Sequence, residues 1–179
     1  PLGWPKCLHD GLFDPVDIGI LKASRGLCPV SREDPCCTVE GGYLCYPNAW
    51  SMSILFYNPK DVRVAPDSWH ARLDPRYKGK IVVPNAPSGL LANAGVAIGA
   101  PDPTNMSDRQ LSDAKSYLKQ LKPNILKLAA QDSDVIRSLA DESAWIGIQW
   151  LGTEFRVKDA GGPVVTGVVP QEGSTGWMD

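Results

Sequence analysis

The stretch that decides the fold is IVVPNAPSGLLANAGVAIGAP, residues 81–101, the longest run without a charged side chain. Its length alone would suit a membrane span, but its prolines and asparagines interrupt it. They favour a short apolar strand at 80–83, a turn, and a helix at 88–98. Ser88 is predicted to cap that helix and Gly99 to end it. The stretch therefore predicts a strand–turn–helix unit, with no insertion into a membrane.

Further strands and helices alternate on both sides of this unit. The helix at 107–121 carries the clearest signal, because Ser107 and Gln110 fit a capping box. Ser133 is predicted to cap a later helix. The predicted strands are 43–47, 54–57, 125–128, 144–149 and 163–169, and the other helices are 66–73, 133–140 and 152–160. This alternation predicts an α/β fold in which a mainly parallel sheet is flanked by helices.

The composition excludes several classes of protein. A hydrophobic content of 43% is too high for a disordered chain. Eighteen Lys and Arg against twenty Asp and Glu give a net charge of −2, so no basic field points to nucleic acid or to an anionic membrane. We therefore expect a globular protein whose partner is neither of these.

The common catalytic and cofactor motifs are absent from the chain. It has no G-x-S-x-G, P-loop, H-E-x-x-H or G-x-G-x-x-G sequence. Its only two histidines, His9 and His70, lie far apart with no recognisable partner constellation. The sequence thus predicts a protein that is not an enzyme, with no catalytic residue, no metal and no cofactor.

The cysteines divide the chain into two parts. All five, Cys7, Cys28, Cys36, Cys37 and Cys45, lie in the first 45 residues. Reduced thiols, disulfides that cross-link a loop, and a metal site with His9 all remain open, and no catalytic centre is expected among them. We predict a loop-rich lead segment at 1–40 and an α/β lobe at 41–179.

Aromatic and carboxylate side chains follow two of the predicted strands. Trp150 comes directly after one strand, and Trp177 and Asp179 come after the last. Because the carboxyl ends of strands in open α/β sheets face the ligand crevice, these three form a candidate box for an organic cation. Gln149, beside Trp150, and Ser88, after the first strand of the deciding stretch, are further candidate ligand contacts.

Several short motifs carry a resemblance to a known family over 41–179. They are GYLCYPNAW at 42–50, LDPRYKGKI at 73–81, LKPN at 121–124, IQWLG at 148–152, VPQEG at 169–173 and WMD at 177–179. In order and spacing they resemble the second lobe of bacterial extracellular solute-binding proteins, in the spermidine/putrescine group of ABC importers. The resemblance implies one lobe of a type II periplasmic-binding-protein-like fold.

The resemblance also implies a function and a set of partners. In that family a Trp-x-Asp and a Trp-x-Gly position clamp the polyamine, and they match Trp177/Asp179 and Trp150/Gly152. The expected partners are a small organic cation (polyamine or amino-acid-like), a missing first lobe and a membrane permease. The expected location is periplasmic or extracellular, or a plastid if the chain is eukaryotic. The chain is then a piece of a longer protein.

One stretch departs from the family pattern. After the strand at 80–83 the polyamine binders carry acidic residues, whereas this chain has PNAPSG at 84–89. An ammonium taken out of water needs a counter-charge. A smaller cation, an amino-acid-like ligand or no ligand at all is consistent with this departure. The alternative function is an interaction module derived from a solute-binding protein, which has no small-molecule ligand.

Overall fold

The computed structural model describes residues 9–12, 14–17, 20, 26, 28–29, 38–39, 42–43, 45–46 and 48–178. The chain forms two compact units. We call residues 52–176 the α/β unit, and residues 1–51 with 177–179 the terminal unit. Each is described by itself.

The terminal unit contains a small antiparallel pairing. Strands β1 (Thr38–Val39) and β2 (Gly42–Tyr43) pair with each other. Val16 exchanges two backbone hydrogen bonds with Tyr43, of 2.7 and 3.0 Å. Cys45 is disulfide-bonded, so the disulfide alternative applies to this cysteine; Cys7, Cys36 and Cys37 lie outside the described residues.

The α/β unit is built on a mixed sheet. Its strands are β3 (Trp50–Tyr57), β4 (Ile81–Pro84), β5 (Ile125–Ala129), β6 (Ile146–Trp150) and β7 (Thr166–Val168), in the order β5-β4-β6-β3-β7, and β8 (Gly176–Met178) pairs with β3. β4 runs parallel to β5 and β6, whereas β3 runs antiparallel to β6 and β7. The predicted α/β architecture is confirmed, and β3 is the strand that makes the sheet mixed.

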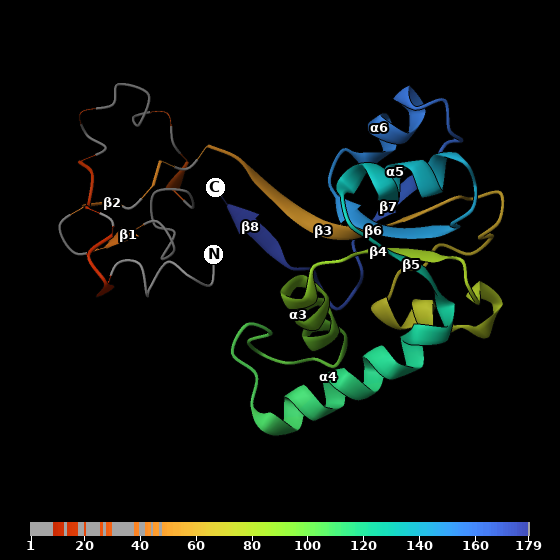
Figure 1. The fold of residues 1–179 in the computed structure, drawn as a ribbon, viewed down its shortest axis with the longest axis horizontal. Helices are drawn as coiled ribbons and strands as arrows, with labels where there is room; N and C mark the ends of the chain where they lie inside the picture. The colour runs from red at the N-terminus through yellow and green to blue at the C-terminus, as the bar shows by residue number, and fades with distance from the viewer. Residues whose placement is uncertain are drawn as a thin grey trace. The chain divides into compact units, whose positions relative to one another are not determined.

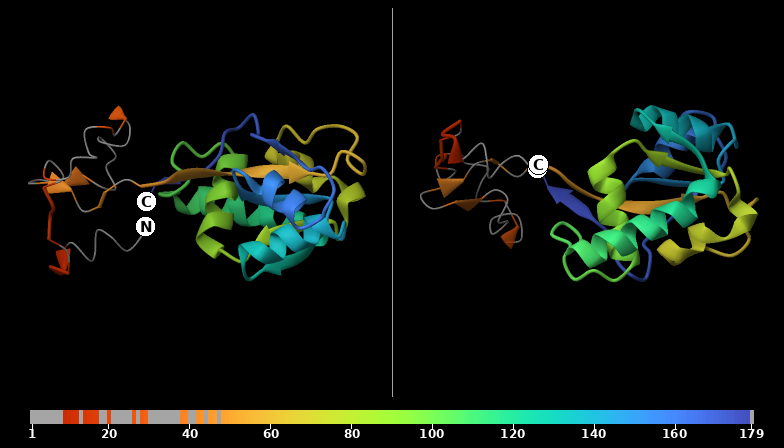
Figure 2. Two further views of the ribbon diagram at one scale, coloured as in Figure 1. Left: turned by 90° about the horizontal axis from the view of Figure 1, so that it is seen from above. Right: turned by 60° about the horizontal axis from the view of Figure 1, so that its bottom comes forward.

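Helices cover both faces of this sheet. They are α3 (Pro87–Ala97), α4 (Asp108–Leu121), α5 (Asp132–Ala140) and α6 (Thr153–Asp159), with short 3-10 turns η3 (Trp69–Leu73), η4 (Pro75–Tyr77) and η5 (Lys122–Asn124). Figure 1 shows α3 and α4 on one side of the sheet and α5 and α6 on the other, and Figure 2 shows the same layers from two further directions. The unit is therefore a three-layer α/β/α sandwich.

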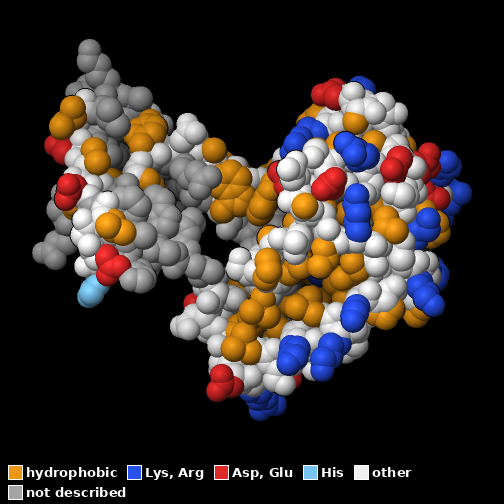
Figure 3. All heavy atoms as spheres, in the orientation of Figure 1, with side chains coloured by type: hydrophobic (Ala, Val, Ile, Leu, Met, Phe, Trp, Pro, Cys, Tyr) orange, Lys and Arg blue, Asp and Glu red, His pale blue; other side chains and the backbone are white. Residues whose placement is uncertain are grey.

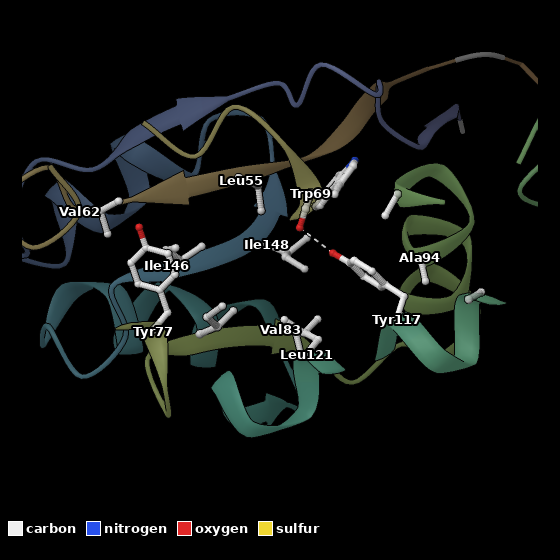
Figure 4. Close-up of a cluster of buried hydrophobic side chains, with 13 residues drawn as sticks. Leu55, Val62, Trp69, Tyr77, Val83, Ala94, Tyr117, Leu121, Ile146 and Ile148 are labelled. Carbon is white, nitrogen blue, oxygen red and sulfur yellow. Dashed lines mark hydrogen bonds between the residues drawn. The ribbon is translucent and has the colours of Figure 1, made fainter. Parts of the chain in front are cut away.

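The period-2 alternation of the strands divides the core between these faces. Leu55 of β3 packs in the buried cluster that includes α3 and α4, which Figure 4 shows in close-up. Its neighbours Ile54 and Phe56 pack in the other cluster, with α5 and α6. The interior strand β3 is thus apolar on both faces, as expected when helices cover both sides of a sheet.

The helix starts agree with the sequence in one case and differ in two. Ser107 and Gln110 form the predicted capping box of α4, the longest helix among the described residues. The predicted cap at Ser88 is wrong, because Pro87 already occupies the first helical position of α3. The predicted cap at Ser133 is also wrong, because Gln131 is the N-cap residue of α5, its backbone N–H donates to the carboxylate of Asp134, and Ser133 already lies in the first turn.

The surface of the α/β unit carries both signs of charge. Figure 3 shows Lys and Arg side chains together with Asp and Glu on the face that it presents, around a central area of hydrophobic side chains. No helix among the described residues has both the length and the hydropathy needed to span a bilayer. The same residues contain no cluster of His, Cys, Asp and Glu that could hold a metal ion.

Candidate functional site

A small pocket opens where the parallel strands β4 and β6 end. It has a volume of about 40 Å³ and lies between the ends of these strands, the first two turns of α3 and residues from β3 and the loop before β8. Its lining residues are Ser53, Pro84, Ala86, Gly89, Leu90, Asn93, Ile148, Gln149, Trp150 and Thr175. None of them carries a charged side chain. This is the edge of an open α/β sheet at which ligands bind.

Gln149 is held in one orientation beside this site. It is 1% exposed. The carbonyl oxygen Oε1 accepts a hydrogen bond of 3.0 Å from the backbone N–H of Trp150, and Nε2 donates one of 3.0 Å to Oδ1 of Asp132. Asp132 also lies 3.8 Å from the guanidinium of Arg156. The side chain of Gln149 therefore lies on the α5 side of the sheet, against a carboxylate that already has a cationic partner.

Three further polar side chains form a chain of hydrogen bonds across the pocket wall. Nδ2 of Asn93 in α3 donates to Oγ of Ser53 in β3 at 3.2 Å. Oγ1 of Thr175 donates to Oδ1 of Asn93 at 2.8 Å. Ser53 and Asn93 are 5% and 4% exposed. Side chains from a strand, a helix and a loop are thereby fixed relative to one another.

The loop that contributes Thr175 is attached to the 3-10 turn η3. The carboxylate of Glu172 accepts hydrogen bonds from Oγ of Ser68 and from the backbone N–H of Trp69, and Nε1 of Trp69 donates to the carbonyl of Gly173 at 2.8 Å. Burial by itself would raise the pKa of the Glu172 carboxyl, but the hydrogen bonds outweigh it and leave that pKa below its usual value. The loop therefore positions Thr175.

The sequence-predicted site residues fall in different places. Gln149 and Trp150 line the pocket. Ser88 is exposed and precedes Gly89, which lines it. Trp177 belongs to the terminal unit, and Asp179 lies outside the described residues. The structure thus brings together Gln149 and Trp150 of the five.

Sequence reasoning missed Ser53, Asn93 and Thr175. Each stands alone on a different element, and only the folded sheet brings them together. The one available signal was a polar residue inside an apolar segment: Ser53 in WSMSILFY and Asn93 in PSGLLANAGVA. A polar side chain in the buried face of an element needs a partner, and such partners gather at sites.

A larger cavity, of about 530 Å³, lies between α5 and α6 on the helical surface of the unit. Its ionisable lining residues, Arg137, Asp141, Arg156 and Asp159, are all exposed. No polar side chain among its lining residues is buried. It is a surface groove with mixed charge, and it lacks the fixed polar groups that a ligand site needs.

Comparisons with known proteins agree with this arrangement. A family model described as bacterial extracellular solute-binding protein matches residues 6–179. A search of curated proteins finds no match.

Three solved structures give the scale of the structural similarity. The spermidine/putrescine ABC transporter substrate-binding protein PotD of Streptococcus pneumoniae is 20% identical with a TM-score of 0.79, and 97% of this chain covers 52% of it. The PotD lipoprotein of Treponema pallidum is 13% identical with a TM-score of 0.81, and 96% of this chain covers 55% of it. The periplasmic binding protein AfuA of Actinobacillus pleuropneumoniae, with fructose-6-phosphate bound, is 20% identical with a TM-score of 0.70 (96% of this chain, 51% of AfuA). The chain thus spans about half the length of the structures that it matches.

Proposed function

The chain belongs to the bacterial extracellular solute-binding protein family, and from this membership we propose that it supplies one lobe of the solute receptor of an ABC importer. Its role is to bind a small organic cation without chemical conversion. The observation that carries the proposal is the pocket at the ends of β4 and β6, with the half-buried ring of Trp150 beside fixed, uncharged polar groups.

The pocket supports a ligand with a single positive charge. An ammonium over an aromatic ring gains about 0.5–2 kcal/mol, and Trp150 offers such a ring. A polyamine brings two or more ammonium groups, and no lining residue supplies a carboxylate. Desolvating a second, unpaired ammonium is costly. An amino-acid-like solute therefore suits the pocket better than spermidine or putrescine. The fold leaves the charge open, since the relatives include a polyamine-type receptor and one with a sugar phosphate.

The remaining site residues complete the proposal. Trp177 and Asp179 are proposed as further ligand contacts, and the carboxylate of Asp179 would supply a counter-charge. Ser88, in the first turn of α3, is proposed to contact the ligand where it leaves the pocket. The missing first lobe would cover the remaining ligand surface, as small-ligand sites bury most of their ligand. The proposed division of the chain remains 1–40 and 41–179.

The proposed location is outside the bacterial cytoplasm, or in a plastid if the chain is eukaryotic, with a membrane permease as the second partner. The disulfide of Cys45 supports an oxidising compartment. A reduced and an oxidised sample compared by thermal unfolding would show whether this cross-link contributes to stability.

The alternative function is an interaction module without a small-molecule ligand. The observation that favours it is the absence of any charged residue from the pocket lining. In that case the lobe would serve as a scaffold that docks another protein, and no small cation would bind to it.

A titration with a matched control separates the two functions. Tryptophan fluorescence or calorimetry would follow binding of butylamine and 4-aminobutanoate. One lobe alone is expected to bind at about millimolar dissociation constant, about −4 kcal/mol, because half of the contacts are missing. Trp150→Ala should weaken binding about two- to thirty-fold, on the scale of a lost cation–π contact.

The control is Phe155→Ala on α6, an aromatic side chain that is 66% exposed and outside the pocket. It should leave binding unchanged. Binding that survives Trp150→Ala would refute the site. If neither compound binds to the folded protein, the interaction module is the better account.

A further inference from the structure

The pocket wall has polar hydrogens to donate that no acceptor among the described residues uses. Asn93, Ser53 and Thr175 share two hydrogen bonds among their side chains. An amide and two hydroxyls carry more hydrogens than those bonds need. Whichever way the amide of Asn93 is turned, one amide hydrogen and one hydroxyl hydrogen remain without an acceptor among the described residues.

Gln149 does not add to these donors. Its amide is held by Asp132 of α5 and by the N–H of Trp150, and Gln149 pairs with Ile54, whose side chain packs on the α5 and α6 face of the sheet. Ser53 and Asn93 are more than nine-tenths buried and line the pocket. Buried donors without acceptors are costly unless a ligand or water satisfies them.

The first turn of α3 faces the same space. Its first backbone hydrogen bond runs from the N–H of Leu90 to the carbonyl of Ala86, so the N–H groups of Ser88 and Gly89 have no acceptor within the helix. Gly89 lines the pocket, and the absence of a side chain leaves its backbone accessible there. The amino end of a helix also carries a partial positive charge.

These donors determine the kind of chemical group that complements the pocket. A carboxylate only accepts hydrogen bonds, and its two oxygens can take several. An ammonium only donates, so it would face the hydrogens of Ser53 and Asn93 with no ionised acceptor in the lining. The volume of about 40 Å³ is a few times the roughly 10–15 Å³ that a cavity needs to hold one water molecule, so it suits one such group rather than a carbon chain.

The geometry points to a carboxylate subsite: the pocket between β4, β6 and α3 receives the carboxylate of a zwitterionic, amino-acid-like ligand whose cationic end lies on Trp150. The inference rests on the proposed function and names its substrate class. It assigns Asn93 and Ser53, together with the first turn of α3, as the groups that select the anionic end.

Three ligands of equal length test it on the intact chain. They are 4-aminobutanoate, 1,4-diaminobutane and butylamine, which share an ammonium and a four-carbon backbone and differ at the other end. The inference expects 4-aminobutanoate to bind at least about tenfold tighter than either amine. Asn93→Asp, nearly isosteric, should weaken 4-aminobutanoate at least about tenfold and strengthen 1,4-diaminobutane.

The matched control is Asn105→Asp, which adds the same charge at an exposed residue outside the pocket and should change neither affinity. Thermal unfolding of each variant verifies the fold. If all three compounds bind equally and Trp150→Ala weakens all of them, the carboxylate subsite is wrong and the cation site survives. If none binds to the folded chain, the proposed function fails and the carboxylate subsite fails with it.

Discussion

The guanidinium of Arg72 lies 4.5 Å above the ring of Trp69, and both side chains are buried with at most 1% exposure. Arg72 also donates from Nε to the carbonyl of Trp69 and from Nη2 to the hydroxyl of Tyr117, at 3.2 and 2.8 Å. Tyr117 in turn donates to the same carbonyl at 2.6 Å, the contact drawn in Figure 4. Burial lowers the pKa of Arg72, and these contacts with Tyr117 oppose the change. The group connects η3 to α4 through a buried charge.

The first prediction concerns the hydroxyl of Tyr117. Tyr117→Phe leaves Nη2 of Arg72 buried without this acceptor, so the free energy of unfolding should fall by about 1–3 kcal/mol. Urea unfolding monitored by circular dichroism measures it. The control is Tyr77→Phe in the same cluster, whose hydroxyl makes no hydrogen bond to the described residues; it should change stability by less than about 0.5 kcal/mol. Equal losses in the two variants would mean that Arg72 needs no acceptor at this position.

The second prediction compares two serines near helix starts. Ser107→Ala removes half of the capping box of α4 and should cost about 1 kcal/mol of stability. Ser88→Ala should cost at most a few tenths of a kcal/mol, because Ser88 lies inside the first turn of α3 and caps nothing. The same urea unfolding measures both. If Ser88→Ala lowered the free energy of unfolding as much as Ser107→Ala, Ser88 would be a helix cap after all, as the sequence predicted.

The third prediction is a pH dependence. Because the pKa of Glu172 is lower in the folded protein than in the unfolded chain, its stabilisation is present above the usual glutamate pKa and disappears as the pH falls through the lowered value. Glu172→Gln should therefore reduce stability at neutral pH but lose less between about pH 6 and about pH 2 than the unmodified protein.

The control is Asp113→Asn, at an exposed carboxylate on α4 outside this loop. The unfolding free energy of this control variant should change with pH, over the same range, as that of the unmodified protein does. If the free energy of unfolding falls equally with acid in the unmodified protein and in Glu172→Gln, this carboxylate does not contribute to the acid dependence of stability.

The fourth prediction concerns the edge strand β5. Leu126 and Leu128 are 40% and 53% exposed there, with Lys127 between them. A lysine on an edge strand opposes pairing with a second copy. Lys127→Val should therefore produce dimers or larger species in sedimentation velocity, whereas Lys115→Val on the exposed face of α4 should remain as the unmodified protein. A monodisperse Lys127→Val sample would show that the edge is protected by other means.

Local signals in the sequence predicted the helices and several strands of this fold. Periodicity and caps are short-range properties, so the helix at 107–121 and the strand ending at Pro84 are confirmed. The place of β3 between β6 and β7 is not a local property. It depends on pairing with segments far along the chain, and no residue near Ser53 encodes that choice.

The residues of the candidate site likewise divide into those that the sequence could predict and those that it could not. Gln149 and Trp150 could be predicted, because residues at the end of a buried strand lie at the ligand edge of a sheet. Ser53, Asn93 and Thr175 could not, since their roles arise from hydrogen bonds between three separate elements. The prediction of Ser88 as a cap failed because Pro87, one residue earlier, has its φ preset for the first helical position.

The position of β3 in the chain also determines the order in which the sheet can form during synthesis. β3 is made before every other strand of its sheet, yet Ser53 pairs with Trp150 and Tyr57 with Thr166. About ninety residues must leave the ribosome before either flank of β3 finds a partner, and such distant pairing is slow. A nascent chain that has emerged only as far as α5 therefore holds β3 unpaired, and this lobe reaches its final structure only after β6 and β7 have also been made.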